Sequence, residues 1–277
     1  MLKKVEDDMY KSVAIISDIH SNHLALEAVL HDIAARNIEL TVNLGDSLFG
    51  PVDPLATARL LMNHENMVHV MGNCDEILLQ KESPSETFQF VKPLLDQGIE
   101  NWIRSCARTW ASEELLFCHG TPWANDQYLL EEVTAEGVQY KDTIHLANEL
   151  LEVQQRYIFC GHSHVFQTKY LPGGKVIMNV GSVGLPAYHD ELPYPHVMES
   201  SSPYADYAIA YRNAQGNWNM EHVMVEYDWE KASSIAQANW NMEHVMVEYD
   251  WEKASSIAQA NGRKDYAFAI RTGNLVY

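Results

Sequence analysis

The sequence predicts a single α/β domain whose functional site lies where the strands end. Three observations support this prediction. A chain of 277 residues can bury one substantial core. Its apolar, strand-like runs alternate with stretches of helical periodicity, as in βαβ units. Five of these runs are followed by Asp, Asn or His, and sites in open α/β sheets form outside the carboxyl ends of the strands.

The first strand and helix are predicted between residues 12 and 34. The run Ser12-Val13-Ala14-Ile15-Ile16 is continuously apolar after its first residue, which is typical of a buried strand. Apolar residues at 26, 29, 30, 33 and 34 then follow helical spacing. Ser21 or Asn22 can cap this helix, so the chain begins with strand, turn and helix.

The same alternation continues along the chain. Further strands are predicted at 40–44, 67–71, 114–118 and 156–160. Helices are predicted at 54–62 with Asp53 as cap, at 85–95, at 99–106 and at 134–155. The segments 168–171 and 175–179 flank Pro172-Gly173-Gly174, which predicts a β-hairpin.

The remainder of the chain is predicted to be a loop followed by strands and a helix. Residues 185–204 are rich in Pro, Tyr, His and Ser and are expected to form a long surface loop. Its Tyr188, Tyr194 and Tyr204 are candidates to stack on a nucleobase, and ordinary loop packing explains them equally well. A strand is predicted at 205–212.

A perfect tandem duplication follows that strand. Residues 217–238 are repeated letter for letter at 239–260, and each copy reads as a strand followed by a short helix. Repeat architectures need several diverged units to build a core. Two identical copies instead indicate a recent duplication or an error in the recorded sequence, so one copy is expected to be dispensable.

Composition limits the classes of partner. The chain has 19 Lys and Arg against 38 Asp and Glu, a net charge of −19, which disfavours long nucleic acids and anionic membranes. It has no apolar run long enough to span a bilayer and no signal-peptide pattern at residues 1–8. Its four cysteines show no CxxC spacing, which favours reduced thiols and a cytoplasmic location.

The residues after the five apolar runs form a set of metal-ligand type. These residues are Asp18, His20, Asp46, Asn73, His119, His162 and His164. Oxygen and imidazole ligands without thiolates suit Mn²⁺, Fe, Zn²⁺ or a mixed pair. Seven ligands exceed what one catalytic metal with an open position needs, and they suit two metals about 3.5–4 Å apart. Asp46 is the single carboxylate on its loop and the best candidate to bridge them.

These motifs together resemble the calcineurin-like metallophosphoesterase superfamily, in particular its small bacterial and archaeal phosphoesterases. The resemblance covers residues 17–184 and rests on Asp18-x-His20, Gly45-Asp46, Gly72-Asn73-Cys74-Asp75, His119-Gly120 and Gly161-His162-Ser163-His164. It implies a four-layer α/β/β/α sandwich, with two mixed β-sheets flanked by helices and the second sheet supplied after residue 165. It also implies one domain over 1–277, with a metal-site core at 12–184 and C-terminal strands and helix at 205–277.

The resemblance further implies how the ligands divide between the two metals. Asp18, His20, Asp46 and His164 would bind one ion, and Asp46, Asn73, His119 and His162 the other. Asn73, Cys74, Asp75 and His119 are the predicted catalytic residues, with Asp75 and Asn22 also expected to support the ligands. Asn22, His23 and His189 are the predicted substrate-binding residues, although exposed histidines commonly have no role.

Three departures from the superfamily pattern narrow the substrate. Protein phosphatases of the superfamily have Val-Asp-Arg-Gly where this chain has Ser47-Leu48-Phe49-Gly50, and the missing arginine argues against phosphoproteins. Cys74 stands where they have a histidine, and a thiol is a poor general acid at neutral pH. Leaving groups that need little protonation are therefore favoured, such as those of nucleotides or activated diesters. Ser21 replaces a glycine, with little expected effect.

We therefore expect a hydrolase that cleaves small phosphoesters by means of a metal-bridging hydroxide. Two divalent ions are expected, with Mn²⁺ favoured over Fe, Zn²⁺, Ni²⁺ or Mg²⁺. The predicted partner is a small phosphorylated metabolite or a nucleotide, without long nucleic acid or membrane, and a homo-oligomer is left open. The alternatives are a dinucleoside polyphosphate hydrolase and, in another class, an interaction scaffold of the same fold, like the retromer subunit of this superfamily.

The motif order disfavours a mononuclear iron oxygenase. Such a site uses His-x-Asp and one distant histidine. This chain has the order Asp18-x-His20, and four further ligands would have no role.

Overall fold

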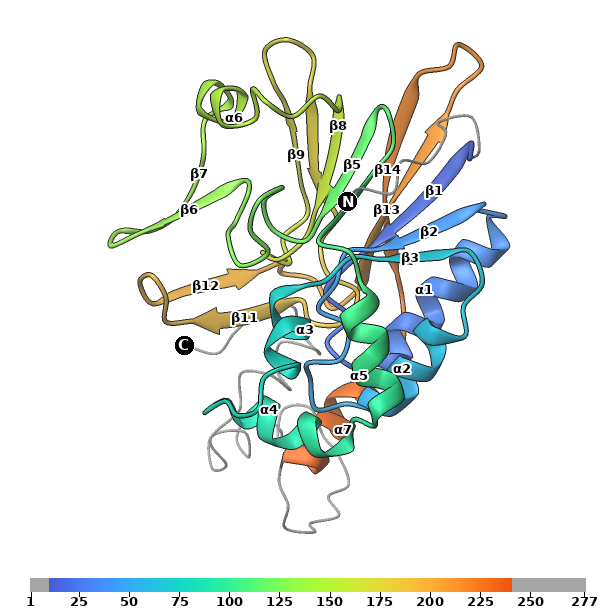
Figure 1. Ribbon diagram of the computed structural model, residues 1–277, viewed down its shortest axis with the longest axis vertical. Coiled ribbons are helices and arrows are strands. Elements are labelled where there is room, and N and C mark those ends of the chain that lie inside the picture. The colour runs from blue at the N-terminus through green and yellow to red at the C-terminus, as the bar shows by residue number, and fades with distance from the viewer. Residues whose placement is uncertain (1–9, 241–277) are drawn as a thin grey trace.

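Two five-stranded mixed β-sheets form the centre of the molecule (Figure 1), in a computed structural model that describes residues 10–240. The first sheet has the order β14-β13-β1-β2-β3 and the second the order β4-β5-β8-β10-β9. The strands of the first sheet are β1 (Ser12–Ile16), β2 (Leu40–Asn43), β3 (Met67–His69), β13 (Ala205–Arg212) and β14 (Trp218–Val225). Those of the second are β4 (Thr109–Ala111), β5 (Leu115–Cys118), β8 (Tyr157–Cys160), β9 (Gln167–Tyr170) and β10 (Val176–Asn179).

The strands that lead to the predicted ligands run parallel to one another within each sheet. In the first sheet β1, β2 and β3 are parallel, and β13 and β14 complete it in antiparallel orientation. In the second sheet β5, β8 and β10 are parallel, and β4 and β9 are antiparallel edges. The carboxyl ends of the parallel strands therefore meet at one edge of each sheet.

The sheets pack face to face, and helices cover their outer faces. Alternate residues of β1 serve the two sides: Val13 and Ile15 join the core between the sheets, while Ala14 and Ile16 join the core beneath the helices. Helices α1 (His23–Ala35) and α7 (Trp229–Trp240) cover the first sheet, and α6 (Thr143–Glu149) covers the second. This arrangement confirms the predicted four-layer α/β/β/α sandwich.

A smaller apolar cluster lies beside the first sheet. It includes Leu48, Leu78, Phe88 and Ile103. The helices that contribute to it are α2 (Pro54–Met62), α3 (Asn73–Leu78), α4 (Glu86–Val91) and α5 (Gln97–Ser105), and the 3₁₀ turn η1 (Lys92–Leu94) directly follows α4. The prediction for α2 is confirmed at both ends, because Asp53 caps it and Pro54 occupies its first position.

Two parts of the chain differ from the prediction by forming β-hairpins. The segment predicted as a helix at 134–155 begins at the last residue of β6 (Glu131–Thr134) and contains β7 (Gly137–Tyr140), and within it only α6 is helical. Gly137 has φ 116°, a conformation that closes the turn and that L side chains rarely adopt. The predicted loop at 185–204 contains β11 (Ala187–Asp190) and β12 (His196–Glu199), which pair with each other. Figure 1 shows both hairpins on the same side of the molecule.

The predicted source of the second sheet was wrong. Only β9 and β10 of that sheet follow residue 165, whereas β4, β5 and β8 precede it. The strands after residue 204 return to the first sheet, where β13 pairs antiparallel with β1. They satisfy the open edge of β1 and provide the apolar surface on which α7 packs.

The first copy of the duplication forms β14 and α7, and from residue 241 onwards the second copy lies outside the described residues. The end of α7 is tied to the loop before α2, because the Asn239 amide donates to the carbonyls of Pro51 (2.7 Å) and Val52 (2.8 Å). Within residues 10–240, no helix is long and apolar enough to cross a membrane.

Candidate metal centre

The predicted ligands lie on loops that follow parallel strands of both sheets. Asp18 and His20 follow β1, and Asp46 follows β2. His119 follows β5, and His162 and His164 follow β8. The first two loops are held side by side by backbone hydrogen bonds, from Asp18 N to Gly45 O at 3.0 Å and from His20 N to Asp46 O at 2.9 Å. Residues distant in the sequence thereby meet at one place.

Six of the seven ligand candidates form two buried groups able to hold a metal ion. The first group is Asp18, His20 and His164, and the second is Asp46, His119 and His162. Within each group the candidate ligand atoms lie within 4.8 Å of one another. This division matches the one implied by the resemblance, while the assignment of residues to individual ions remains a prediction.

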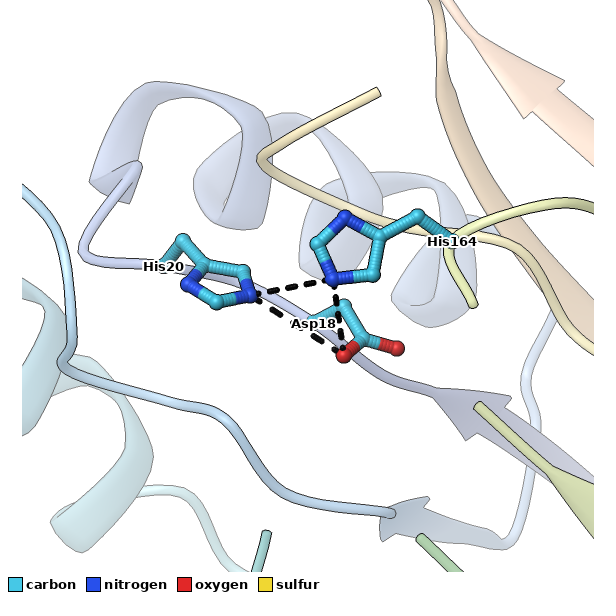
Figure 2. Close-up of side chains that lie close together, drawn as sticks. All are labelled: Asp18, His20 and His164. Carbon is cyan, nitrogen blue, oxygen red and sulfur yellow. Dashed lines mark hydrogen bonds and ion pairs between the residues drawn. The ribbon is translucent and has the colours of Figure 1, made fainter. Parts of the chain in front are cut away.

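The first group is compact (Figure 2). Asp18 Oδ1 lies 3.2 Å from His164 Nε2 and 4.0 Å from His20 Nε2. The two imidazole nitrogens face each other at 3.2 Å. Three ligand atoms from loops after β1 and β8 therefore point toward a common position.

Asp46 lies between the two groups. Its Oδ2 is 3.8 Å from His20 Nε2 of the first group and 3.4 Å from His119 Nε2 of the second. Its other oxygen accepts a hydrogen bond from Cys74 N at 2.8 Å, which fixes the orientation of the carboxylate. This is the placement expected of a carboxylate shared by two ions.

Asn73 joins the second group through its amide. Asn73 Oδ1 lies 3.0 Å from His119 Nε2, so the oxygen and the nitrogen approach the same position. The backbone N–H of His162 donates to Asp18 Oδ2 at 3.0 Å, linking the loop after β8 to the first group.

Three of the histidines are oriented by backbone carbonyls. The Nδ1 of His20 contacts Phe49 O at 2.8 Å, that of His119 contacts Leu44 O at 3.1 Å, and that of His164 contacts Leu185 O at 2.5 Å. A carbonyl only accepts, so each Nδ1 carries the hydrogen. In the neutral form of each imidazole, which is the form that binds a metal, the lone pair of Nε2 is then directed at the centre.

The donor set fits divalent cations. Asp18 Oδ1 is buried and has no hydrogen-bond partner among the described residues. It faces the lone pairs of His20 and His164, so acceptors alone surround this position. Buried acceptors that face one another without a donor are unfavourable, and a cation among them removes the conflict.

The charges of the site are strongly coupled. Burial raises the pKa of Asp18, but His164 and His119 outweigh it and bring the pKa to about 2. Burial likewise raises the pKa of Asp46, and His119 outweighs it, so this pKa also lies well below the usual range. Burial lowers the pKa of His119, yet Asp46 and Asp18 raise it to about 9. Burial and the charge of His119 lower the pKa of His162 to about 4.

The backbone of the ligand loops adopts the left-handed conformation. Five ligand candidates have positive φ: Asp18 (55°), His20 (46°), Asp46 (54°), His162 (70°) and His164 (61°). Only nine non-glycine residues of the described chain have positive φ, so this strain is concentrated at the site. Such conformations persist where the surrounding structure imposes them, commonly at functional sites.

Two glycines allow the ligand loops after β2 and β3 to touch. A Cβ at Gly45 would collide with the backbone nitrogen of Gly72, and a Cβ at Gly72 would collide with the Asp46 side chain. The Gly-Asp and Gly-Asn motifs therefore require glycine at positions 45 and 72, because a side chain there would prevent this close approach.

Asp75 supports the loop that carries Asp46. Its carboxylate accepts from the backbone N–H groups of Asp46 (2.9 Å), Ser47 (3.0 Å) and Gly72 (3.1 Å). Burial raises its pKa to about 6, with a further contribution from the charge of Asp46. Asp75 therefore positions a ligand, while Cys74 remains a thiol because burial raises its pKa well above the ordinary value.

The predicted substrate-binding residues are placed in different environments. Asn22 is fully buried; its side-chain oxygen caps α1, and its nitrogen donates to Gly184 O (3.0 Å) and Tyr227 OH (3.2 Å). These bonds hold the loop, and a substrate contact by Asn22 stays a prediction. His189 is exposed and pairs with Glu191 at 3.4 Å. His23 begins α1 and is half-buried.

Two tyrosines line the metal centre. The ring of Tyr128 stacks on that of His162 at 4.6 Å, and the ring of Tyr188 lies 4.5 Å from that of His164. Their hydroxyls are 2.6 Å apart. Tyr188 was among the predicted aromatic candidates, but Tyr128 was missed because no motif marks it. Tyr204 instead packs on Trp229.

Comparison with known proteins places the chain in a family. The profile of the calcineurin-like phosphoesterase superfamily domain matches residues 12–201. The chain therefore belongs to the calcineurin-like phosphoesterase superfamily, as its motifs predicted. This family is metal-dependent, in agreement with the two groups of candidate ligands.

Individual relatives share the architecture. An uncharacterised protein of Methanocaldococcus jannaschii is 28% identical over 262 residues, covering 81% of this chain and 91% of the relative. The crystal structure of a metallophosphoesterase from Sphaerobacter thermophilus is similar with a TM-score of 0.63 and 22% identity, over 82% of this chain and 93% of that one. A hypothetical protein from Pyrococcus horikoshii gives a TM-score of 0.64 and 15% identity, over 96% and 99% of the two chains. The two structures show the shared fold.

Proposed function

We propose that this protein is a binuclear metal-dependent phosphoesterase that hydrolyses small phosphodiesters or nucleotide-type substrates. The observation that carries the proposal is the pair of buried ligand groups with Asp46 between them. One ion would be held by Asp18, His20, Asp46 and His164, and the other by Asp46, Asn73, His119 and His162. Mn²⁺ is the favoured metal for this oxygen and imidazole set.

Bound divalent ions would supply Lewis-acid activation of a water molecule and of the phosphoryl group. The residues of the chain prepare for this chemistry. The carbonyls of Phe49, Leu44 and Leu185 keep three histidines in the ligating tautomer. The backbone bonds of Asp75 hold the Asp46 loop, and the half-buried Asn73 presents its amide to the second group.

The surroundings of the centre favour a substrate with a good leaving group. The thiol of Cys74 has a strongly raised pKa and donates its proton poorly at neutral pH. Residues 47–50, which lack the arginine of the protein phosphatases, are engaged in holding the fold: Ser47 N donates to Asp75, and Phe49 O accepts from His20. Residues 47–50 offer no cationic side chain and Cys74 is a poor proton donor, so nucleotide phosphates or activated diesters suit the site.

The test is hydrolysis of two chromogenic substrates, bis(p-nitrophenyl) phosphate and p-nitrophenyl phosphate. The purified protein is assayed with Mn²⁺, after chelation, and after Mn²⁺ is restored. We expect turnover that is lost with chelator and regained with metal, with the diester preferred. A dinucleoside polyphosphate assayed in parallel distinguishes the related hydrolase activity.

Matched variants show whether turnover belongs to this site. Asp46→Asn is expected to lower turnover by at least ~100-fold, because it removes the shared carboxylate. Asp126→Asn makes the same charge change at an exposed position and should retain activity. Absence of turnover in folded, Mn²⁺-loaded protein would contradict the proposal and favour a scaffold of the same fold. Full activity of Asp46→Asn would contradict the shared role of Asp46.

A further inference from the structure

A chain of hydrogen-bond contacts joins the β11/β12 hairpin to the metal centre. His196 Nδ1 lies 2.7 Å from Tyr194 O, and His196 Nε2 lies 2.9 Å from Tyr128 OH. Tyr128 OH is 2.6 Å from Tyr188 OH, which is in turn 2.9 Å from His162 O. The chain thus starts at a backbone carbonyl of the hairpin and ends at the backbone carbonyl of a ligand candidate.

The members of this chain are shielded from water and pack on the ligands. His196 is buried, and both tyrosines are at most half-exposed. The Tyr128 ring stacks on His162, meets the His196 ring edge-on at 5.6 Å, and so connects the two. A missing hydrogen in this setting cannot be replaced easily by bulk water.

Counting hydrogens shows which form of His196 completes the chain. Four contacts need four hydrogens, and the carbonyls of Tyr194 and His162 at the two ends supply none. Two phenols and a neutral imidazole carry only three hydrogens. An imidazolium adds the fourth, and each contact then has one donor: His196 to Tyr194 O, His196 to Tyr128, Tyr128 to Tyr188, and Tyr188 to His162 O.

We propose that His196, acting through Tyr128 and Tyr188, is a positioning residue for the His162 side of the metal centre, and that it acts when both of its ring nitrogens carry hydrogen. With a neutral His196, one contact of the chain lacks a hydrogen and two acceptors face each other. The carbonyl that accepts from Tyr188 at the end of the chain belongs to His162, which is held at φ 70° in the left-handed conformation. This inference rests on the proposed function for its relevance to catalysis.

The groups around His196 include both signs of charge. Asp190 is its cross-strand neighbour on β11, and the charges of Asp190 and Glu131 both act on Tyr128. Strand β7, which packs against β12, brings Tyr140, and Lys141 Nζ contacts the Tyr128 carbonyl at 3.2 Å. Lys141 is itself paired with Glu149 at 3.2 Å, which offsets its charge.

The first test uses NMR on the full-length, metal-free protein. It follows the linkage between the protonation of His196 and the environment of the His162 carbonyl. The ring nitrogens of His196 and the carbonyl carbon of His162 are monitored as pH is varied. We expect the His162 carbonyl shift to follow the titration curve of His196. The ring of His162 itself titrates in a separate range, because burial lowers its pKa to about 4.

Three variants make the test specific. Tyr128→Phe keeps the ring stacked on His162 but removes the central hydroxyl, so the linkage should disappear while His196 still titrates. His196→Gln should abolish the change of the His162 carbonyl shift that follows the titration of His196. His189→Gln, at an exposed site on β11, should preserve that change. A His162 carbonyl that ignores His196 in the wild type, or that responds equally in Tyr128→Phe, would overturn the proposal.

The second test measures Mn²⁺ affinity on either side of the His196 titration. We expect the wild type to bind Mn²⁺ about 2- to 10-fold more tightly than Tyr128→Phe on the acid side, the range of one net hydrogen bond. On the alkaline side the two should bind equally. A difference that is the same at every pH would mean that the Tyr128 hydroxyl acts independently of His196, and this would contradict the proposal. Neither test uses turnover, so an inactive protein would overturn the proposed function and leave this inference standing.

Discussion

Glu131 is a buried residue next to the ligand loop. Ser163, between His162 and His164, donates its hydroxyl to Glu131 Oε1 at 2.9 Å and accepts from the Asn179 amide at 3.0 Å. Glu131 Oε2 is buried and has no hydrogen-bond partner among the described residues. Burial raises the pKa of Glu131 from 4.5 to about 7, so an ionised Glu131 weakens the folded state.

The stability of the protein should therefore depend on the pH through Glu131. Below pH ~4.5 the carboxyl is protonated in both states, and above pH ~7 it is ionised in both. In between, the folded state binds more protons than the unfolded state. The contribution of Glu131 to the free energy of unfolding therefore falls as pH rises, by roughly 3 kcal/mol. Urea denaturation of metal-free Glu131→Gln at several pH values should show this decline removed.

The neighbouring carboxylate provides the control. Glu132→Gln, at an exposed position on the same strand, should keep the wild-type pH dependence. Other groups of the site titrate in the same interval, so the difference between wild type and variant is the informative quantity. Equal slopes for wild type and Glu131→Gln would contradict the raised pKa.

The ligand candidates were predictable residue by residue, whereas the residues around them were not. Asp18 and Asp46 stand out because a carboxylate directly after a buried parallel strand has a defined position at the sheet edge. Tyr128 has no such marker, and it reaches His162 only because the second sheet and the β6/β7 segment bring them together. Asn22 is a buried helix cap, a position that its place beside the Asp18-x-His20 motif does not reveal.

At the scale of elements, the two small hairpins were the principal failures of prediction. The sequence of 134–155 has apolar residues at helical spacing near its end, and these belong to α6 alone. In 187–199 the alternation that marks a strand is short and is interrupted by the turn around Pro193. Residues of both hairpins contact partners distant in the sequence, Glu131 with Ser163 and His196 with Tyr128, which local sequence does not encode.

The duplicated element gives a sharp prediction. In the first copy Trp218, Val223, Ala232 and Ala236 are buried, so β14 and α7 are part of the core. Deleting 239–260 places Asn261 directly after Ala238, where Asn239 now donates to the carbonyls of Pro51 and Val52. The deletion variant should be soluble and active, with a free energy of unfolding within about 0.5 kcal/mol of the full chain.

The control for this variant removes both copies. Deletion of 217–260 takes away β14 and α7 and uncovers the face of the first sheet beneath them. This variant should not yield soluble protein. If the single deletion also fails to give soluble protein, the second copy is required and the prediction is wrong.

At the scale of the whole molecule, the metal centre connects the two sheets. Each group draws ligands from both: Asp18 and His20 of the first sheet meet His164 of the second, and Asp46 of the first meets His119 and His162 of the second. An ion bound to either group would link the carboxyl edges of both sheets. Binding should therefore resist separation of the sheets during unfolding.

Thermal unfolding with and without Mn²⁺ measures this effect. Mn²⁺ at 100-fold above its dissociation constant is expected to add about 2.7 kcal/mol per site, and chelator should reverse the gain. Asp46→Asn should lose most of it, because under the proposed assignment both ions would share this carboxylate, while Asp126→Asn should behave like the wild type. An unchanged melting temperature with saturating Mn²⁺ would argue against metal sites at these residues.

The four-layer architecture followed from local signals together with the family resemblance, but the path of the chain did not. The parallel strands β1, β2, β5 and β8 were recognisable because each is an apolar run followed by a ligand motif. The return of β13 to the edge of β1 depends on which edge is open in the assembled sheet. That property belongs to the tertiary structure, and no pattern within 205–212 reports it.

The left-handed backbone at the five ligand residues restricts which amino acids can occupy these positions. Positive φ is several-fold enriched in Asp, Asn and His among non-glycine residues, and it is a severe outlier for β-branched ones. Asp and His are also the types that supply oxygen and imidazole to a divalent ion. At Asp18, His20, Asp46, His162 and His164 the backbone and the metal therefore select the same few amino acids. A glutamate can bind a divalent ion, but it is not among the residues favoured in the left-handed backbone conformation.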